Sequence, residues 1–351
     1  MRLLQLHDEV WDSGIAHYAL TLSEELSRRG HEVHFWAAPR SVAARRAGEA
    51  GLHLRELERP WLRLPGLRRE LRRLAIELVN AHTGSSHSLA AALTLGSGLA
   101  LVRTRADSRP PAANPLARLL ARRTRAFIAA NSRLKSQLAG AYPASRVQMI
   151  LQGIASPPGA PPPLPEDLVV GILGRLDPVK GHEDLMTAAA IIARRLPRVK
   201  FLAAGDGRPE RLRLLKTRLD SLGLAGRFEY LGRVPDAFEF LARCRLGVVA
   251  STGSEAVSRA ALEWMAAGRA LVATNVGCLP YLVDDGRTGR LVAPNDPQAL
   301  AQALQSLLED PAAAASLGAR GRESFERRFT LARFADQTEI LYETALRHLP
   351  S

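Results

Sequence analysis

The feature that most constrains the fold is a repeated pattern of an apolar strand, a glycine- or serine-containing turn and a helix. Four segments in the second half begin this pattern: 168–173, 199–204, 228–231 and 246–250. The alternation predicts a parallel α/β sheet, because parallel strands are joined by crossover connections that usually contain a helix. Open α/β sheets bind ligands at the edge formed by the carboxyl ends of their strands. We therefore expect the four strand ends to converge on one site.

Two glutamates lie where one of these strands passes into a helix. The segment 246–250 predicts a buried strand, and 259–267 predicts a helix that ends at Gly268. Glu255 therefore lies at the N-terminal mouth of the helix and Glu263 lies within it. Such a mouth binds anions, while carboxylates beside it accept hydrogen bonds from hydroxyls. A phosphate joined to a sugar suits this geometry, and a capping carboxylate with a solvated glutamate is the simpler alternative.

Two cations follow the first of the four strands. Arg175 and Lys180 lie in a short loop that is bounded by Gly174 and Gly181. At the carboxyl end of a strand, such a loop is placed to contact an anionic ligand. Charges that simply lie in water are the alternative, since long cationic side chains are mostly exposed.

The sequence resembles the retaining family-4 glycosyltransferases over nearly its whole length. The motifs that carry the resemblance are Gly174-Arg175 with Lys180-Gly181, Gly205-Asp206-Gly207, Leu231-Gly232-Arg233, the Glu255/Glu263 pair, Ala266-Ala267-Gly268, and Asp285-Gly286 with Gly289. Each motif alone is a weak match, but their order and spacing together are specific. The resemblance implies an α/β fold of the GT-B type, with two facing Rossmann-like domains, parallel sheets and an interdomain cleft.

The resemblance also implies an activity, namely transfer of a sugar from a nucleotide-sugar donor of the UDP, GDP or ADP type to a hydroxyl acceptor with retention. Breaking the anomeric C–O bond leaves a negatively charged diphosphate, which cations and backbone N–H groups stabilise. Catalytic roles are implied for Arg175, Lys180 and Glu255. Donor-binding roles are implied for Gly14, Gly174, Gly207, Arg233, Val234, Ala256, Val257, Ser258 and Glu263. No acidic or cysteine spacing typical of a metal site is present, so we expect a metal-independent reaction without a cofactor.

The first half begins with the same kind of pattern. A strand at 3–6 leads through Ser13 and Gly14 into a helix at 15–29. Family relatives place a glycine-rich loop near the donor phosphates at this point, and here only Gly14 is a glycine. An ordinary helix entry is the alternative.

Polar residues at two later strand ends are candidates for the acceptor side. These candidates are His82, Arg103, Arg105 and Asp107, which follow or end the strands expected at 78–81 and 100–104. Relatives commonly carry a histidine near the second of these ends, where Ala106 stands in this chain. Converging guanidinium groups would suit an acidic or phosphorylated acceptor, whereas a solvated loop is the alternative.

A proline-rich segment at 155–167 predicts a domain boundary, because it cannot form a helix or a central strand. We predict an N-terminal, acceptor-side Rossmann-like domain at 1–154, the linker at 155–167 and a nucleotide-sugar donor domain at 168–328. By resemblance, a helix at 329–351 packs back on the first domain. The chain has 351 residues and is 46% hydrophobic, enough for two domains with separate cores.

The chain is strongly basic, with a net charge of +13, and only four of its 48 basic residues are lysine. This excess implies an acidic partner, such as a phosphorylated substrate or an anionic lipid. In the segment 61–74, Leu67, Leu71 and Leu74 recur at helical spacing among arginines. They either belong to an amphipathic helix on an anionic membrane, with Trp61 at the headgroups, or face the domain core. Aromatic residues are not interleaved with the basic runs, so nucleic acid is not expected as a partner.

No long apolar run predicts a transmembrane helix, and the first strand is too short for the apolar region of a signal peptide. Cys244 and Cys278 are expected to be reduced and packed. We expect a cytoplasmic protein, with peripheral contact at the inner face of the cell membrane, acting on a lipid-linked or lipopolysaccharide-type glycan in a bacterium. A non-catalytic basic binding protein on a degenerate GT-B fold is the alternative, because Ala106 and Tyr281 replace polar groups of relatives.

Overall fold

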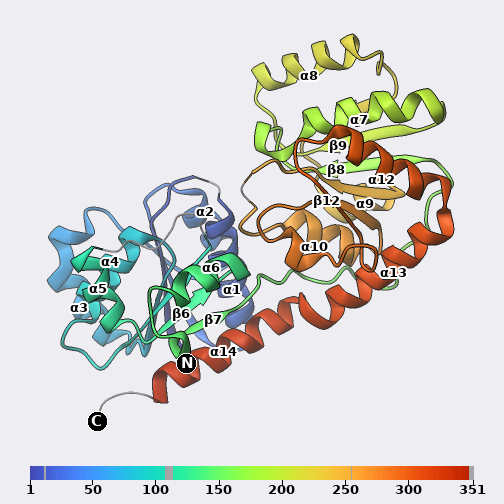
Figure 1. Ribbon diagram of the computed structural model, residues 1–351. Helices are drawn as coiled ribbons and strands as arrows, with labels where there is room; N and C mark the ends of the chain where they lie inside the picture. Colours follow the sequence, from blue (N-terminus) through green and yellow to red (C-terminus); the bar gives the residue numbers. More distant parts are fainter. Residues whose placement is uncertain (12, 107–113, 254, 348–351) are drawn as a thin grey trace. The chain divides into compact units, whose positions relative to one another are not determined.

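The computed structural model describes residues 1–11, 13–106, 114–253 and 255–347, and within them the chain divides into two units. The first unit is Met1–Gly153 together with the chain from Leu331 onward, and the second is Ile154–Thr330. Each unit is a parallel sheet flanked by helices, drawn in Figure 1. The predicted α/β architecture with parallel sheets is therefore confirmed.

The first unit contains a sheet with the strand order β3-β2-β1-β4-β5-β6-β7. Its strands are β1 (Arg2–His7), β2 (Glu32–Ala37), β3 (His53–Glu56), β4 (Leu78–Ala81), β5 (Ala100–Arg105), β6 (Ala126–Ala129) and β7 (Val147–Met149). Its helices are α1 (Gly14–Arg28), α2 (Val42–Glu49), α3 (Leu64–Arg73), α4 (Gly84–Thr94), α5 (Pro115–Arg123), α6 (Ser132–Ala139) and α14 (Leu331–Arg347), with short 3₁₀ turns at Pro60–Arg63 and Ala144–Arg146. The two faces of the sheet are both covered, which suits strands that are buried along almost their whole length.

The two faces of this sheet belong to separate apolar clusters. In β2, Phe35 packs with α1 and α2, whereas Trp36 packs on the opposite face with α3 and α4. This follows from the two-residue period of a strand. Leu67 and Leu71 of α3 are buried in the second cluster, and Leu74 at the C-cap of α3 is half-buried against it. The core alternative is thus confirmed for these three leucines, and the prediction that they lie on a membrane is wrong.

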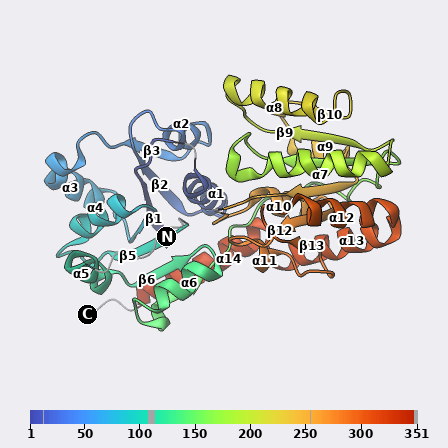
Figure 2. The same ribbon diagram turned by 45° about the horizontal axis from the view of Figure 1, so that its top comes forward.

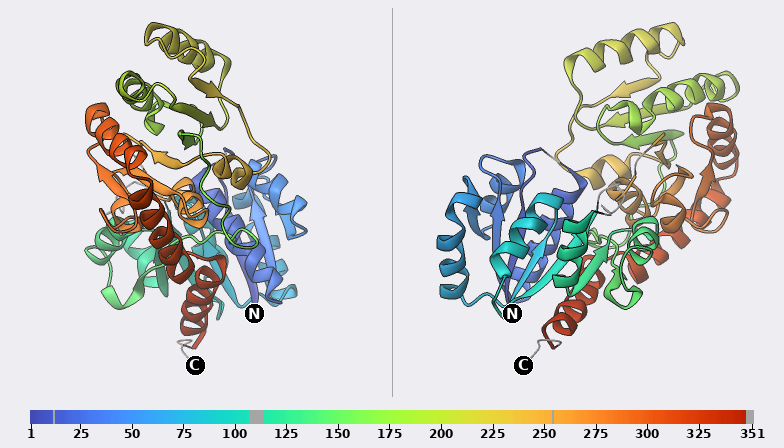
Figure 3. Two further views of the ribbon diagram at one scale, coloured as in Figure 1. Left: turned by 90° about the vertical axis from the view of Figure 1, so that its right-hand side faces the viewer. Right: turned by 60° about the vertical axis from the view of Figure 1, so that its left-hand side comes forward.

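The last helix completes the first unit. α14, drawn in red, packs against α1 and β5 of this unit (Figures 1 and 3). It begins at Leu331, just after Thr330 pairs with Ile154 in an isolated parallel bridge. The first unit is therefore built from two separate stretches of sequence, and both crossings between the units lie side by side.

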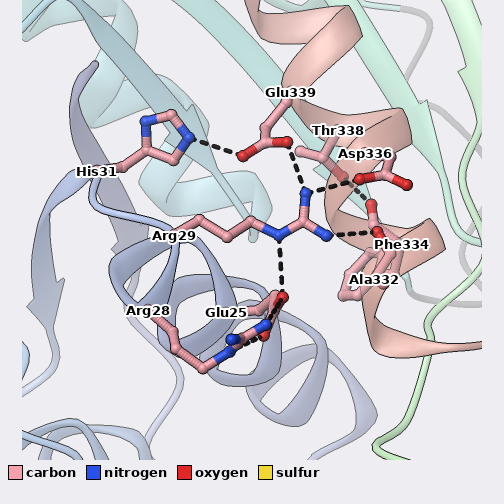
Figure 4. A network of polar contacts seen from close by, with 9 residues as sticks. All are labelled: Glu25, Arg28, Arg29, His31, Ala332, Phe334, Asp336, Thr338 and Glu339. Atoms are coloured by element: carbon pink, nitrogen blue, oxygen red, sulfur yellow. Dashed lines mark hydrogen bonds and ion pairs between the residues drawn. The ribbon is translucent and has the colours of Figure 1, made fainter.

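A network of charges joins α14 to α1. Arg29, at the C-terminal cap of α1, donates hydrogen bonds to Glu25 at 2.9 Å, Asp336 at 2.7 Å and Glu339 at 2.8 Å, as Figure 4 shows. The ring of His31 lies 2.7 Å from the other oxygen of Glu339. Because the side chain of Arg29 is only 20% exposed, these contacts are screened less than surface ion pairs. Arg29 therefore fixes the first turns of α14.

The second unit contains a sheet with the order β10-β9-β8-β11-β12-β13. Its strands are β8 (Val169–Leu173), β9 (Lys200–Ala204), β10 (Phe228–Tyr230), β11 (Leu246–Val249), β12 (Ala270–Thr274) and β13 (Arg290–Val292). Its helices are α7 (His182–Arg195), α8 (Pro209–Ser221), α9 (Ala237–Ala242), α10 (Arg259–Ala266), α11 (Leu279–Leu282), α12 (Pro297–Glu309) and α13 (Pro311–Arg328), with a 3₁₀ turn at Pro178–Lys180. α7 and α12 lie side by side in Figure 2, and α10 packs with α13 and β12.

The proline-rich segment 155–167 groups with the second unit. The helix expected from residue 329 onward corresponds to α14, which begins at Leu331, three residues after α13 ends at Arg328. Among the described residues, no helix combines the length and apolar character needed to span a bilayer.

We predict that Arg29→Ala loosens the C-terminal helix. Removing the guanidinium leaves Glu25, whose side chain is 1% exposed, without one of its cationic partners. The expected loss is about 1–3 kcal/mol of unfolding free energy, below the range for a fully buried pair because Arg29 is partly solvated. Hydrogen exchange followed by mass spectrometry should show faster exchange in α14. Arg45→Ala, which removes an exposed pair with Glu49, is the control and should leave α14 unchanged.

Candidate functional site

The carboxyl ends of four adjacent parallel strands form one edge of the second unit. β10, β9, β8 and β11 are neighbours in the sheet, and the turns that follow them are tied by backbone hydrogen bonds. Gly174 donates to Ala204 at 2.8 Å, and Gly205 donates to Gly232 at 2.8 Å. The strand ends with predicted site residues therefore do lie together within this unit.

Lys180 and Glu255 are in direct contact at this edge. The Lys180 Nζ donates to Glu255 Oε1, and Ser251 Oγ donates to the same oxygen at 2.5 Å. The Glu255 side chain is 2% exposed and that of Lys180 is 28% exposed. A carboxylate this deeply buried requires a charge partner, which Lys180 supplies, while the ammonium keeps a face toward solvent. The pair thus places a cation beside the mouth of α10.

Close backbone packing fixes this pair. Gly181 has φ +71°, and a Cβ atom built there would lie 1.8 Å from the carbonyl oxygen of Ala250. Only glycine accepts both the left-handed conformation and this approach. On the other side, Gly277 has φ +57° and its ideal Cβ would lie 2.2 Å from the carbonyl oxygen of Glu255. The two glycines let the Lys180 turn and the segment after β12 close around Glu255.

The start of α10 lies beside Glu255. Ser258 is the N-cap residue and is buried, yet its side chain makes no capping hydrogen bond. Glu263 lies one turn into the helix and accepts from Arg259 at 3.0 Å. Burial raises the pKa of the Glu263 carboxyl, and the nearby charge of Arg259 partly opposes this shift. Glu263 is therefore a buried acceptor for hydroxyl hydrogen bonds, held by one arginine.

All but one of the remaining donor-side candidates lie at the same edge. Arg175 directly follows Gly174 after β8, is 57% exposed at its side chain, and lies 4.0 Å from Asp177. An ideal Cβ at Gly207 would meet the Tyr230 hydroxyl at 2.7 Å. Arg233 and Val234 follow Gly232 after β10, and Ala256 and Val257 lie between Glu255 and the N-cap of α10. Gly14 belongs to the first unit, where it is the first residue of α1.

The acceptor-side candidates meet at the carboxyl edge of the first sheet. His82 follows β4, while Arg103 and Arg105 end β5, and all three are buried. The Arg103 guanidinium donates to the backbone carbonyls of Ala81 at 3.0 Å and Thr104 at 2.6 Å. The alternative of a solvated loop is therefore wrong for both arginines. Asp107 lies outside the described residues.

A series of buried hydrogen bonds connects α14 to this edge. The Tyr342 hydroxyl accepts from Gln5 Nε2 at 3.2 Å and from Asn80 Nδ2 at 2.7 Å. Gln5 Oε1 lies 2.8 Å from His82 Nε2, so this nitrogen carries the proton and Nδ1 has a lone pair. Burial holds the pKa of His82 well below its usual value, and the imidazole is neutral at pH 7. This series of hydrogen bonds therefore selects one tautomer of His82.

Sequence reasoning missed Gln5, His7, Ser251 and Tyr342. His7 ends β1, is fully buried, and burial lowers its pKa to about 4. A histidine and a glutamine two residues apart, among leucines, were a local signal for β1. Tyr342 carried no such signal, because its partners are 337 and 262 residues away.

The two cysteines are buried as unreactive thiols. Burial raises the pKa of both Cys244 and Cys278 to about 12, so neither thiol ionises at neutral pH. No group of three or more histidine, cysteine or acidic side chains is arranged as a metal site among the described residues.

Two family models match the chain over most of its length. The model "Glycosyltransferase Family 4" matches residues 13–155, and the model "Glycosyl transferases group 1" matches residues 167–310. The chain belongs to the family-4 glycosyltransferases. The first match lies in the unit that carries His82 and Arg103, and the second in the unit that carries Lys180 and Glu255.

Curated relatives and solved structures agree with this family. The chain is 34% identical over 193 residues to a D-inositol 3-phosphate glycosyltransferase of Mycobacterium avium, covering 53% of this chain and 43% of the relative. It is 35% identical over 166 residues to a phosphatidyl-myo-inositol mannosyltransferase of Mycolicibacterium smegmatis, covering 46% and 42%. These matches thus span less than half the length of the relatives.

The fold of this glycosyltransferase-family chain is shared with solved structures. Anabaena Alr3699/HepE in complex with UDP superposes with a TM-score of 0.85 at 20% identity, covering 98% of this chain and all of the other. The lipopolysaccharide outer core galactosyltransferase WaaB superposes with a TM-score of 0.76 at 14% identity, covering 98% and 99%. The predicted GT-B class of fold is confirmed.

We predict that Gly181→Ala destabilises the second unit strongly. The added Cβ collides with a backbone carbonyl, whose displacement would move the Lys180 turn away from Glu255. The expected cost is about 3 kcal/mol or more, measured by thermal or denaturant unfolding. Gly226→Ala is the matched control, because Gly226 has φ +76° with no atom within 4 Å of its ideal Cβ. It should cost only about 1 kcal/mol of backbone strain, and equal costs would contradict the packing argument.

Proposed function

We propose that the chain transfers a sugar from a nucleotide-sugar donor to a hydroxyl of an anionic acceptor, with retention at the anomeric carbon. The observation that carries this proposal is the Lys180–Glu255 pair at the mouth of α10. Membership of the family supports the class of reaction. Related folds have been solved with UDP and with UDP-glucose, which supports a UDP-type donor as the first choice.

The chemistry proposed for the carboxyl edge of the second sheet centres on the leaving group. The bond between the anomeric carbon and the diphosphate oxygen breaks, and the acceptor oxygen forms the new bond on the same face. Lys180, Arg175 and the N-terminus of α10 stabilise the charge that develops on the diphosphate. The diphosphate takes the proton from the acceptor hydroxyl, so that atoms and charge balance. No metal is required in this scheme, because the cations of the chain supply the positive charge.

The carboxylates at this edge suit binding rather than nucleophilic attack. Glu255 is engaged by Lys180 and Ser251, and Glu263 is engaged by Arg259. We assign Glu255 to hydroxyls of the donor sugar and Glu263 to those of the ribose. The backbone near Arg233 and Val234 would bracket the base. Retention by attack on the leaving-group face is compatible with carboxylates that are already neutralised.

The proposed acceptor carries a phosphate or another acidic group. Arg103 and Arg105 lie at the carboxyl edge of the first sheet, beside the neutral imidazole of His82. The named relatives act on inositol phosphate or phosphatidylinositol, and WaaB is named for lipopolysaccharide core. A lipid-linked or lipopolysaccharide-type glycan, as well as a phosphorylated polyol, fits an edge with two arginines.

The test of this function combines donor binding with turnover. UDP should raise the melting temperature more than GDP, ADP or NAD, since a ligand that binds only the native state stabilises it. With UDP-glucose and D-inositol 3-phosphate as probes, Lys180→Ala and Glu255→Gln should each lower transfer by about a hundredfold or more. The anomeric configuration of the product, read by NMR, should match that of the donor.

Lys200→Ala is the matched control, because Lys200 starts β9 at the opposite edge of the sheet and is exposed. It should leave transfer unchanged. If no nucleotide shifts the melting temperature, the chain is a non-catalytic binding protein and the proposal fails. Wild-type rates in Lys180→Ala would contradict the assigned mechanism even if UDP binds.

We further propose that the first unit contacts an anionic membrane through the exposed apolar side chains of residues 61–62 and of the helix α5. Trp61 and Leu62 are 56% and 78% exposed, and Leu116 and Leu119 of α5 are 57% and 55% exposed. α5 buries none of its residues fully and carries several arginines. Exposed leucines beside arginines favour the interface of an acidic bilayer. This surface differs from the predicted one, whose leucines at 67 and 71 are in the core.

The membrane proposal predicts that Leu116→Ser with Leu119→Ser weakens co-sedimentation with vesicles of anionic phospholipid by about tenfold or more. The expected loss follows from the apolar area that no longer enters the interface. Leu214→Ser, which changes an exposed leucine of α8 in the second unit, is the control and should bind as the wild type does. Equal binding by all three proteins would refute this surface.

A further inference from the structure

Tyr281 and Arg328 form a contact that the proposed mechanism does not use. The guanidinium carbon of Arg328 lies 5.2 Å from the centre of the Tyr281 ring and 4.6 Å from the centre of the Phe329 ring. Both distances are within the range of cation–π attraction. The same guanidinium donates a hydrogen bond to the backbone carbonyl of Tyr281 at 3.1 Å. Arg328 therefore holds Tyr281 through its ring and through its backbone.

The surroundings of Arg328 differ from those of its neighbour at the end of α13. Arg327 is exposed and forms an exposed ion pair with Glu323 at 3.1 Å. Arg328 is half-buried and lies against the two aromatic rings instead. A cation beside an aromatic face is attracted more strongly where water is partly excluded. The contact of Arg328 is thus specific, whereas that of Arg327 is an ordinary surface pair.

Phe329 anchors one side of this contact. Its side chain is 1% exposed, and its carbonyl accepts a hydrogen bond from the backbone N–H of Ile154 at 3.1 Å. The next residue, Thr330, pairs with Ile154 in the parallel bridge where the chain leaves the second unit. A buried ring and a paired backbone hold Phe329 in place, and Arg328 lies against that ring.

The other side of the contact is a single helical turn. Tyr281 belongs to α11, which contains only the four residues Leu279–Leu282. One turn is not stable alone, because the start of a helix fixes several residues for few hydrogen bonds. The position of α11 therefore depends on contacts with the rest of the unit. Leu279 and Leu282 supply buried apolar contacts, and Arg328 adds the contact with Tyr281.

This turn is attached to the backbone of Glu255. The backbone N–H of Cys278, the N-cap residue of α11, donates to the Glu255 carbonyl at 2.7 Å. The Tyr281 N–H donates in turn to the Cys278 carbonyl at 3.0 Å. Gly277 leaves no room on this side, since its ideal Cβ would lie 2.2 Å from the same Glu255 carbonyl oxygen. A displacement of Tyr281 would therefore move the backbone that carries the Glu255 carboxylate.

We propose that Tyr281 and Arg328 are positioning residues for the donor sugar, because they hold the segment 277–282 against Glu255. This proposal rests on the proposed function, in which Glu255 binds hydroxyls of the donor sugar and Glu263 binds those of the ribose. Tyr281 and Arg328 act on the sugar through Glu255, while the nucleotide keeps contacts of its own. A contribution to the stability of the second unit alone is the competing prediction, and it would not distinguish the sugar from the nucleotide.

The test compares the affinities of UDP-glucose and UDP for the full chain by isothermal titration calorimetry. Tyr281→Leu removes the ring face, and Arg328→Gln removes the charge. Each should weaken UDP-glucose binding by about tenfold, the loss expected when one charge-assisted hydrogen bond to the sugar is misplaced. The affinity for UDP should stay that of the wild type. Tyr281→Phe keeps the ring and should bind both ligands as the wild type does.

Arg327→Ala is the matched control, because it removes the neighbouring exposed arginine and should leave both affinities unchanged. The proposal is overturned if Tyr281→Leu and Arg328→Gln keep wild-type affinity for UDP-glucose. It is also overturned if they lose affinity for UDP and UDP-glucose equally. Weak binding of UDP-glucose by Tyr281→Phe would contradict the role of the ring, since the cation–π contact does not need the hydroxyl.

Hydrogen exchange of the ligand-free chain distinguishes this proposal from the proposed function. Arg328→Gln should exchange faster than the wild type at the amides of residues 278–283, whereas Arg327→Ala should not. Unchanged exchange in Arg328→Gln overturns the proposal whether or not a nucleotide binds. If UDP fails to bind the wild type, the proposed function fails, and faster exchange in Arg328→Gln still shows that Arg328 holds the segment.

Discussion

The close approach of Gly181 to the carbonyl of Ala250 is the constraint on which the edge of the second sheet depends. It brings the turn after β8 against the end of β11, so that the ammonium of Lys180 reaches the buried carboxylate of Glu255. Without this contact, Glu255 would be a buried charge with no cation, which is among the most costly situations in a protein interior. The backbone contact at Gly181 therefore determines which charged groups meet at the site, because it brings Lys180 within reach of Glu255.

The two units accommodate their buried polar groups in different ways. At the edge of the second sheet, a buried carboxylate accepts hydrogen bonds from a lysine and a serine hydroxyl. At the edge of the first sheet, burial keeps the imidazoles of His7 and His82 neutral, with the pKa of His7 lowered to about 4. In the proposed reaction, the first arrangement suits a charged leaving group and the second suits neutral hydroxyls.

The features of the fold and the site that could be predicted from the sequence are those whose signal lies within a short stretch of residues. Glycine turns after apolar strands placed Lys180, Arg175 and Glu255 at one edge, because parallel strands share a direction. Which way α3 faces was not decided by its leucine spacing alone, since a core stripe and a membrane stripe have the same period. The link from Tyr342 to Gln5 joins residues 337 positions apart and could not be read from any window of sequence. The grouping of the candidate residues was predictable, and the long-range contacts that orient them were not.

The position of α14 also has a consequence for the order in which the chain can fold. The second unit is one continuous stretch, so all of its residues are available as soon as residue 330 has been synthesised. The first unit, although most of it is made earlier, must wait for Phe334, Leu341 and Tyr342 to cover its sheet. During synthesis, this uncovered face is an apolar surface of the kind that chaperones bind and that promotes aggregation. The half of the protein that emerges first is thus the half that finishes folding last.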